Sequence, residues 1–259
     1  MKTLGIDIGG TGIKGAVVDT NRGVLKTDRL RILTPHPATP DAVTEVVERV
    51  VEHFEWEGPI GCTFPGVVRD GTVHTAANLD PAWIGHKATS VVTAAARSEH
   101  TAVVLNDADA AGIAEVAFGA GRKRSGVVLV VTLGTGIGSA LFVDGELVPN
   151  AELGHLPLEG GAAERYAAES VRETEGLSWE DWAGRVSEYL NLVENLLWPD
   201  LIVLGGGVSK QADRFLPLLS VRTEVVAAEL RNRAGIVGAA LEARKTHEAG
   251  STKKSKRKR

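Results

Sequence analysis

The fold of this chain is decided by the stretch Leu4-Gly-Ile-Asp-Ile-Gly-Gly-Thr-Gly-Ile-Lys-Gly-Ala-Val-Val-Asp19. Hydrophobic residues alternate with small or polar ones up to Ile8, glycines and a threonine interrupt them, and a hydrophobic run resumes at Ala16. This pattern predicts a β-hairpin with a glycine-rich turn. Glycines let backbone N–H groups converge on an anion, while Thr11 adds a hydroxyl and Lys14 a positive charge. We interpret the stretch as a phosphate-binding hairpin, and a turn that is rich in glycine for conformational reasons alone is the alternative.

The same glycines also match the dinucleotide-binding pattern G-x-G-x-x-G over residues 10–15. That pattern requires a helix directly after the glycines, whereas residues 16–19 are predicted to form a strand. The loop contains no Gly-Lys-Ser/Thr sequence, so it does not match a Walker A phosphate loop either. The stretch is therefore a hairpin rather than a strand–loop–helix unit.

A second copy of the turn stands at residues 134–140. It repeats Gly-Thr-Gly-Ile, two further residues and an alanine, with the spacing found over residues 10–16. Two copies of one turn so far apart predict two related halves, each of which presents one loop to a shared cleft. Such a pair of loops could hold a chain of phosphates.

The bulk composition excludes several classes of protein. With 259 residues, 43% of them hydrophobic and 24% charged, the chain suits one large or two medium globular domains. The net charge of -4 does not indicate nucleic-acid binding, although the last seven residues carry six positive charges. Cys62 is the only cysteine, so neither an intrachain disulfide nor a cysteine metal cluster can form. We find no segment suited to span a bilayer and no room for a signal peptide, and we expect a cytoplasmic protein.

Further along the chain, strands and helices alternate, which indicates a mixed or parallel sheet with covered faces. Thr39 and Ser178 are predicted to cap helices, and Pro40 and Pro199 to begin one and stop the other. The predicted strands cover residues 24–32, 60–64, 101–105 and 201–204, and the predicted helices begin at or near residues 40, 89, 108, 179, 210 and 234. We expect the helix from residue 234 to end at 245, and the chain to be disordered from about residue 248.

Asn106 and Asp107 follow a predicted strand and precede a helix. The carboxyl ends of strands are where open α/β sheets bind ligands. Phosphoryl transfer requires a clamp for the donor phosphates, a metal ion and a carboxylate that accepts the proton of the acceptor hydroxyl. Asp107 is the candidate for the carboxylate. The alternative for Asp107, and for Asp109, is the commoner role of a helix cap.

Five motifs stand in the order found in sugar kinases of the ROK type, which the chain resembles over all but its tail. They are Asp-x-Gly-Gly-Thr from Asp7, Leu-Asn-Asp-Ala from Leu105, Thr-Leu-Gly-Thr-Gly-Ile-Gly from Thr132, Glu-Leu-Gly-His from Glu152 and Leu-Gly-Gly-Gly-Val-Ser from Leu204. Segments such as Thr63-Phe-Pro-Gly-Val and Trp198-Pro-Asp-Leu also resemble the polyphosphate glucokinases of this group. The resemblance implies an α/β, two-domain actin-like ATPase (ribonuclease H-like) fold with the sugar and the phosphate donor in the interdomain cleft. We expect one lobe over residues 1–106 plus 235–247, a second over 107–234, and a disordered basic tail over 248–259.

The resemblance also implies roles for individual residues. Asp107 would be the general base for the 6-hydroxyl of glucose. The sugar would be surrounded by Asn78, Asn106, Asp107, Glu152, His155 and Glu164. The donor phosphates would be held by Asp7, Gly9, Gly10, Thr11, Gly12, Lys14, Thr132, Gly134, Thr135 and Gly136, and a nucleotide by Gly205, Gly206 and Gly207. The last three lead into the helix predicted from residue 210, whose N-terminus suits a phosphate or an adenosine.

One departure from the family concerns metals. Many relatives carry a Cys-x-Cys-Gly-x-x-Gly-Cys zinc cluster after the Glu-x-Gly-His motif, whereas residues 158–164 contain no cysteine. His155 therefore lacks the partners that a structural zinc requires, and we assign it to the sugar, with a buried core histidine as the alternative. We expect Mg²⁺ with the phosphate donor and no zinc.

The predicted function is phosphorylation of glucose to glucose 6-phosphate with inorganic polyphosphate, and ATP as a further donor, by a cytoplasmic homodimer without membrane or specific nucleic-acid partners. The alternatives are an ATP-only glucokinase or mannokinase and a sugar-responsive ROK regulator. Such regulators place a helix-turn-helix before the kinase-like domain, whereas this sequence starts at the first strand. We expect Lys14 with Arg122, Lys123 and Arg124 to begin a cationic track for polyphosphate; a solvated loop is the alternative for the last three.

Overall fold

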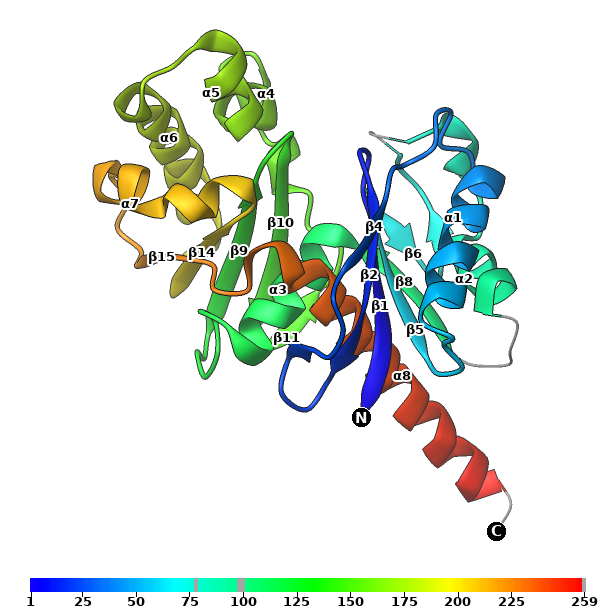
Figure 1. The fold of residues 1–259 in the computed structure, drawn as a ribbon. Coiled ribbons are helices and arrows are strands. Elements are labelled where there is room, and N and C mark those ends of the chain that lie inside the picture. The colour runs from blue at the N-terminus through cyan, green and yellow to red at the C-terminus, as the bar shows by residue number, and fades with distance from the viewer. Residues whose placement is uncertain (77–78, 97–100, 258–259) are drawn as a thin grey trace. The chain divides into compact units, whose positions relative to one another are not determined.

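The computed structural model describes residues 1–76, 79–96 and 101–257, with residues 252–257 described by their backbone alone. The chain forms two compact units (Figure 1). Unit 1 comprises Met1–Ala114 and Arg233–Arg259, and unit 2 comprises Glu115–Asn232. We expected boundaries after residues 106 and 234, but the first division lies within helix α3, Asp107–Phe118. The first two turns of α3 therefore belong with unit 1.

Unit 1 is built on a six-stranded sheet of order β3-β2-β1-β5-β8, with β4 also pairing with β2. Its strands are β1 Lys2–Ile8, β2 Ile13–Asp19, β3 Val24–Leu25, β4 Leu30–Ile32, β5 Ile60–Phe64 and β8 Ala102–Asn106. The predicted hairpin is confirmed, because β1 and β2 pair antiparallel, whereas β1, β5 and β8 run parallel. The single strand predicted over 24–32 is instead the two short strands β3 and β4.

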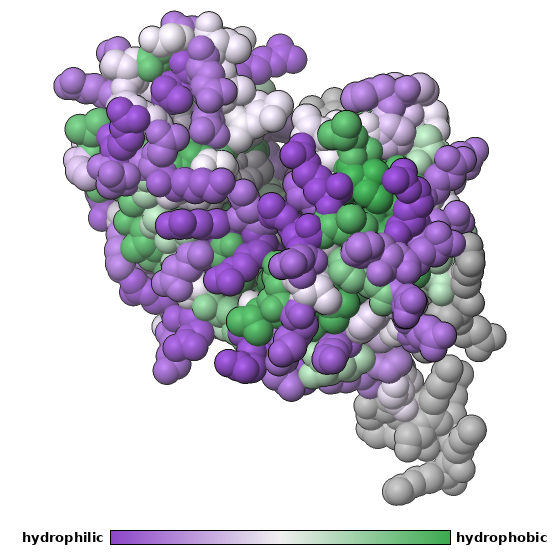
Figure 2. Space-filling model, viewed as in Figure 1, coloured by the Kyte–Doolittle hydropathy of each residue, from purple (hydrophilic) through white to green (hydrophobic). Residues whose placement is uncertain are grey.

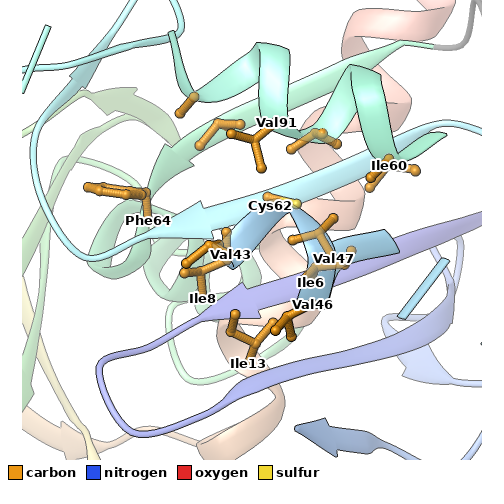
Figure 3. Close-up of a cluster of buried hydrophobic side chains, with 14 of the residues drawn as sticks. Ile6, Ile8, Ile13, Val43, Val46, Val47, Ile60, Cys62, Phe64 and Val91 are labelled. Carbon is orange, nitrogen blue, oxygen red and sulfur yellow. The ribbon is translucent and has the colours of Figure 1, made fainter. Parts of the chain in front are cut away.

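Two helices cover one face of this sheet. Helix α1 spans Pro40–His53, and its N-terminus is capped as predicted by the side chain of Thr39, which accepts the N–H of Ala42. Helix α2 spans Ala88–Ala96. Figure 3 shows how valines of these helices meet the isoleucines of β1 and β2 and the residues of β5 in one hydrophobic core. The loop between β5 and α2 carries β6 Val68–Arg69, β7 Thr72–Val73 and the short helix η1 Pro81–Trp83.

Helix α8, Ala234–Arg257, packs on this sheet by direct backbone contact. A Cβ atom on Gly61 of β5 would lie 1.9 Å from the carbonyl oxygen of Ala239, and one on Gly5 of β1 would lie 2.1 Å from that of Ile236. Glycine is required at these two positions because α8 occupies the space of any side chain. The helix also continues past residue 245, through residues we expected to be disordered, as far as Arg257.

Unit 2 repeats the topology of unit 1. Its sheet has the order β11-β10-β9-β14-β15, which matches β3-β2-β1-β5-β8 position by position along the chain. The strands are β9 Val127–Leu133, β10 Ile137–Val143, β11 Glu146–Val148, β14 Leu201–Gly205 and β15 Val225–Ala227. As in unit 1, the two strands of a hairpin, β9 and β10, pair antiparallel. The first strand, β9, pairs parallel with β14, and β14 pairs parallel with β15. The prediction of two related halves agrees with this repeat.

Helix α6, Trp179–Leu197, supplies most of the helical core of unit 2 and is capped by Ser178 as predicted. The single helix predicted from residue 210 is wrong: the structure has η3 Gly207–Gln211, α7 Ala212–Phe215 and η4 Leu216–Leu218 in its place. Pro217 explains part of the break, since proline lacks an N–H and disfavours a helical residue before it. The remaining elements are η2 Leu153–His155, β12 Pro157–Leu158, β13 Gly161–Ala162, α4 Glu164–Ala167, α5 Glu169–Glu175 and η5 Arg231–Arg233.

The surface is mainly polar on the face shown in Figure 2, where hydrophobic residues form patches between hydrophilic ones. Among the described helices, none combines the length and the hydrophobicity that crossing a bilayer requires.

The contact between α8 and the sheet predicts a strong position dependence of glycine replacement. Gly61→Ala should destabilise the protein by about 1–3 kcal/mol, because the added methyl group forces the backbone of α8 away from β5. The matched control is Gly184→Ala in α6, where an added Cβ has no neighbour within 4 Å. Alanine there should leave stability unchanged or raise it by up to about 1 kcal/mol. Thermal unfolding measures both, and equal melting temperatures for the two variants would contradict the packing argument.

A buried carboxylate joins α6 to the segment before β15. The Glu194 side chain is 2% exposed and accepts hydrogen bonds from the side chain of Arg222, at 3.1 Å, and from the N–H groups of Arg222 and Thr223. Burial alone would raise the pKa of the Glu194 carboxyl, but the hydrogen bonds from Thr223 and Arg222 outweigh it and hold the pKa below its usual value. The ionised form is therefore the one that stabilises the fold.

A glutamate whose pKa is lowered by folding contributes stability above its unfolded pKa of about 4.3, and this contribution is lost as the pH falls through the folded value. Glu194→Gln should therefore lower the melting temperature at pH 7 and flatten its decline in acid below about pH 4.3. Glu180→Gln, at an exposed position in the first turn of the same helix, is the control. If the pH profiles of the Glu194 variant and the wild type run parallel, the carboxylate does not act in this way.

Candidate active site

The sheet of unit 1 brings several predicted site residues to one edge. Asp7 is opposite Thr63 in the pairing of β1 with β5, and Phe64 is opposite Asn106 in the pairing of β5 with β8. These positions lie at the carboxyl ends of three parallel strands, where open α/β sheets bind ligands. Asp107 follows directly as the first residue of α3.

Asp7 stands at the centre of a small polar network. Its Oδ1 accepts a hydrogen bond from the Thr63 hydroxyl at 2.9 Å, and its Oδ2 accepts one from Lys14 Nζ at 2.9 Å. The Thr63 hydroxyl oxygen also accepts the N–H of Ile8 at 3.2 Å. Lys14, which we predicted to bind phosphate, is thus already paired with a carboxylate across the hairpin. Thr63 fixes the Asp7 carboxylate, a role that the sequence alone did not indicate.

The turn of the first hairpin is closed by a hydrogen bond from the N–H of Gly9 to the carbonyl of Gly12 at 3.3 Å. The hydroxyl of Thr34 donates to the carbonyl of Gly9 and holds the turn from outside. Gly10 is half-buried and Thr11 exposed at the tip. The turn therefore combines a fixed base with an accessible tip, which suits a group that approaches the backbone closely.

Asn106 and Asp107 are adjacent but differ in burial and in their hydrogen bonds. Asn106 is buried, its amide nitrogen donates to the carbonyl of Gly66 at 3.1 Å, and its Oδ1 accepts the N–H of Asp109 at 3.0 Å. Asn106 thus caps α3, the role we considered for Asp107 and Asp109. Asp107 is exposed, and its Oδ1 accepts the adjacent N–H of Ala108 at 2.9 Å. Asn78, predicted to contact the sugar, lies outside the described residues.

In unit 2 the second glycine turn is held by two short helices. The N–H of Gly134 donates to the carbonyl of Gly136 at 3.0 Å, so the turn is one residue shorter than the first. Ser170 of α5 donates its N–H to the carbonyl of Gly134 and its hydroxyl to that of Thr135, at 3.1 and 2.7 Å. Glu164 of α4 accepts the N–H of Ile137 at 3.3 Å. The turn is therefore anchored to α4 and α5.

Three residues assigned to the sugar come together here. His155 Nδ1 lies 3.9 Å from a carboxylate oxygen of Glu152, and its Nε2 lies 3.8 Å from one of Glu164. The motif is docked on β10 through Gly154, where a Cβ would lie 2.2 Å from the carbonyl oxygen of Ile137. His155 is exposed, so the alternative of a core histidine is wrong. Alternating carboxylates and ring nitrogens provide the acceptors and donors that hydroxyl groups require.

The same arrangement does not suit a metal. The two carboxylates face different ring nitrogens, so a metal bound at either nitrogen of His155 would meet only one of them. A zinc site needs at least three protein ligands. Within the described ranges, no group of three or more histidine, cysteine, aspartate or glutamate residues is placed to hold a metal ion. Cys62 is buried inside unit 1, and burial raises the pKa of its thiol far above the usual value, with Asp7 adding to the effect.

The glycines at the end of β14 lie beside the second hairpin. Gly205 is opposite Thr132 in the pairing of β14 with β9, and a Cβ on Gly206 would lie 2.0 Å from the carbonyl oxygen of Leu133. Glu169 of α5 lies against this segment, because a Cβ on Gly207 would lie 3.3 Å from one of its carboxylate oxygens. Burial, and next the neighbouring Glu173, raise the pKa of the Glu169 carboxyl. The predicted nucleotide segment thus lies beside α5, a proximity that the sequence did not reveal.

The cations at 122–124 lie elsewhere. They precede β9, whereas the glycine turn follows it, so the seven residues of that strand separate them by roughly 20 Å. Arg124 also forms an ion pair with Glu224 at 2.5 Å. The prediction that these residues begin a phosphate track at the turn is therefore wrong, and the solvated loop describes them better.

Comparison with known proteins agrees with this geometry. Residues 3–175 match the ROK family. The chain belongs to this family. It is 51% identical over 238 residues to a polyphosphate glucokinase from Mycobacterium tuberculosis (strain ATCC 25618 / H37Rv), a match that covers 92% of this chain and 89% of the relative. A glucokinase from Streptomyces coelicolor is 27% identical over 313 residues, covering 92% and 96% of the two chains.

Solved structures of ROK proteins show the same fold. An inorganic polyphosphate/ATP-glucomannokinase from Arthrobacter sp. strain KM superposes with a TM-score of 0.90 at 49% identity, covering 95% of this chain and 99% of the other. A ROK glucokinase from Streptomyces griseus, in complex with glucose and AMPPNP, superposes with a TM-score of 0.80 at 25% identity, covering 95% and 100%. The expected actin-like, two-domain α/β fold is confirmed.

The donor set at His155 predicts the metal content of this ROK protein. Elemental analysis of the purified protein should find far less than one zinc per chain, because the chain has a single, buried cysteine and no three-ligand group within the described residues. A chelator should leave the melting temperature unchanged for the same reason. One tightly held zinc per chain, or a chelator-induced loss of folding, would overturn the assignment of His155.

Proposed function

We propose that the protein transfers a phosphoryl group from inorganic polyphosphate to the 6-hydroxyl of glucose, with ATP as an alternative donor. The supporting observation is the Asp107 carboxylate, which is exposed at the first residue of α3 beside the strand ends that carry Asp7 and Asn106. The relatives in the ROK family support the donor and the acceptor, since they include a polyphosphate glucokinase, a polyphosphate/ATP-glucomannokinase and a glucokinase in complex with glucose. A sugar-responsive regulator would not need a carboxylate placed in this way.

In the proposed reaction Asp107 accepts the proton of the glucose 6-hydroxyl. The oxygen then attacks the terminal phosphorus of the donor, and the bond from that phosphorus to the bridging oxygen breaks. The products are glucose 6-phosphate and a donor shortened by one phosphoryl group. Because such a transition state has little covalent chemistry for the protein to perform, positioning and electrostatic stabilisation supply most of the catalysis.

The sugar is assigned to polar side chains of both units. Unit 1 would contribute Asn78, Asn106 and Asp107, and unit 2 would contribute the Glu152, His155 and Glu164 group. Hydroxyl groups that find paired donors and acceptors bind well, while an analogue that lacks one leaves a polar group without a partner. The exact range of hexoses depends on these pairings, and a mannokinase activity stays open as an alternative.

The donor phosphates are assigned to the two glycine turns, to Thr132 and to Lys14, and the phosphates of a nucleotide donor to Gly205, Gly206 and Gly207. The Asp7 carboxylate fits a magnesium ion that accompanies the phosphates, since it is partly exposed and carries oxygen ligands, and Mg²⁺ binds through one or two carboxylates plus substrate phosphates. When bound, the ion would neutralise charge on the donor. Lys14 holds the Asp7 carboxylate at 2.9 Å and would orient it.

Two further parts of the proposal concern the protein in the cell. We infer a cytoplasmic location, because ATP, a proposed donor, and glucose 6-phosphate, the proposed product, are metabolites of the cytoplasm. We also infer a homodimer without specific nucleic-acid binding. Sedimentation analysis of the purified protein tests the dimer directly.

Replacement of the proposed base tests the function. Asp107→Asn should lower turnover by about 10²–10⁴-fold, the usual contribution of general-base catalysis, while glucose affinity changes little. Formation of glucose 6-phosphate measures turnover, and intrinsic fluorescence measures glucose binding. Asp41→Asn is the matched control, because Asp41 is also an exposed aspartate in the first turn of a helix, α1, and lies outside the site.

The control variant should keep wild-type turnover. Near wild-type turnover in a folded Asp107→Asn protein would remove Asp107 from the mechanism. A wild-type enzyme that uses ATP but ignores polyphosphate would overturn the donor assignment and favour the ATP-only alternative.

A further inference from the structure

Two arginines of unit 2 share one indole ring. The guanidinium carbon of Arg172, on α5, lies 4.2 Å from the ring centroid of Trp179, and that of Arg214, on α7, lies 5.0 Å from it. The two positive charges are therefore held close together. Stacking on an aromatic face leaves the N–H edges of a guanidinium able to bind an anion, often with two parallel hydrogen bonds.

Among the described ion pairs, no carboxylate lies closer than 3.9 Å to either arginine of this cluster. Arg172 has an ion pair with Glu173 at 3.9 Å, but the Glu173 side chain is 66% exposed, and Arg172 Nε is buried without a hydrogen-bond partner in the described structure. Arg214 donates to the neutral side chain of Gln211 at 3.3 Å. By contrast, Arg185 lies 2.8 Å from a carboxylate. The Arg172 side chain is 19% exposed, so an anion can bond to the N–H groups of the guanidinium that stay accessible.

The cluster adjoins both glycine segments of unit 2. Helix α5 begins at the second glycine turn, where Ser170 donates to the carbonyls of Gly134 and Thr135. Arg172 is two residues further along this helix, a rise of about 3 Å. Gln211, which accepts the hydrogen bond from Arg214, belongs to η3, the short helix that starts at Gly207. The exposed Lys210 stands in the same helix.

We propose that Arg172, Arg214 and Lys210 bind the phosphoryl groups of a long polyphosphate chain beyond those held at the glycine turns. The inference rests on the proposed function and deepens it, because it identifies the residues that distinguish a long donor from a short one. A polyphosphate chain has no base or ribose, so only its repeated negative charge can be recognised. The nearby carboxylates of Glu169, Glu173 and Asp213 repel the negative chain, so its attraction to the cluster depends on the arginine pair.

ATP provides the contrast. Its charge ends at the third phosphoryl group, and the rest of the molecule gains nothing from a cationic cluster. The face of Trp179 is shared with guanidinium groups, so adenine would have to displace them in order to stack there. The cluster should therefore favour long polyphosphate over ATP.

The test compares donors in the double variant Arg172→Gln, Arg214→Gln. The KM for long-chain polyphosphate should rise about tenfold or more, whereas the KM for triphosphate and for ATP should change by less than about threefold. Because each cation that binds a flexible polyanion contributes roughly 0.7 to the salt dependence, the slope of log KM against log salt should fall by about 1–1.5. Equilibrium binding of long-chain polyphosphate without glucose should weaken in parallel.

Two controls separate charge from folding and location. Arg172→Lys with Arg214→Lys keeps both charges and should restore most of the affinity for long chains. Arg122→Gln with Lys123→Gln removes two charges at the opposite end of β9 and should leave the polyphosphate KM as it is in the wild type. Thermal unfolding establishes that each variant is folded.

The outcomes are distinct. If the wild type does not use polyphosphate, the proposed function fails. If the wild type uses it and the folded double variant keeps the same polyphosphate KM and salt slope, this inference fails while the proposed function survives. An equal loss for ATP and long-chain polyphosphate would also overturn it, because it would assign the cluster to phosphates that both donors share, or to stacking of the adenine on Trp179.

Discussion

Direct contact between backbones, made possible by Gly5 and Gly61, is the constraint on which unit 1 depends. At these two positions no side chain of the sheet separates α8 from β1 and β5. The same helix crosses α3 at Gly238, where a Cβ would lie 1.7 Å from the carbonyl oxygen of Ala110. Three strand ends and the start of α3 are thereby fixed together, which places the Asp7 and Asp107 carboxylates. Gly235, in the first turn of α8, lies beside Asp7, and the N-terminus of a helix favours a negative charge there.

The repeated sheet order explains why each unit has one glycine turn, but the two turns are built differently. In unit 1 the turn is held by Thr34, and the nearby cation, Lys14, is already paired with Asp7. In unit 2 the turn is held by α4 and α5, and the latter carries Arg172 with its buried and unbonded Nε. A common topology therefore supports different chemistry, because the segments that hold the two turns, Thr34 in unit 1 and α4 with α5 in unit 2, lie outside the repeated strands.

Local signals predicted most of the fold. The hairpins, the caps at Thr39 and Ser178 and the buried strands follow from patterns within a few residues, and the structure confirms them. The errors about the site arose where the outcome depends on the pairing and packing of elements rather than on a local pattern. The cations at 122–124 precede β9 and the glycine turn follows it, so the length of this extended strand separates them although they are close in the sequence. The pairing of Lys14 with Asp7 depends on the register of the hairpin, and the approach of Arg214 to Trp179 depends on how α7 packs on α6.

The charged residues near the two glycine turns differ in how closely they are paired, and this difference assigns the reaction and the affinity for a long donor to different residues. Lys14 and Asp7 neutralise each other at 2.9 Å, so together they offer a donor little net attraction, although they can orient a metal and a phosphoryl group. The arginines on Trp179 have no comparably close carboxylate among their described contacts, and they gain the most when a polyanion arrives. Since electrostatic attraction between exposed charges is screened within about 8 Å at physiological salt, only cations beside the bound chain contribute much. The reaction is thus assigned to residues of unit 1, and the preference for a long donor to the arginines of unit 2.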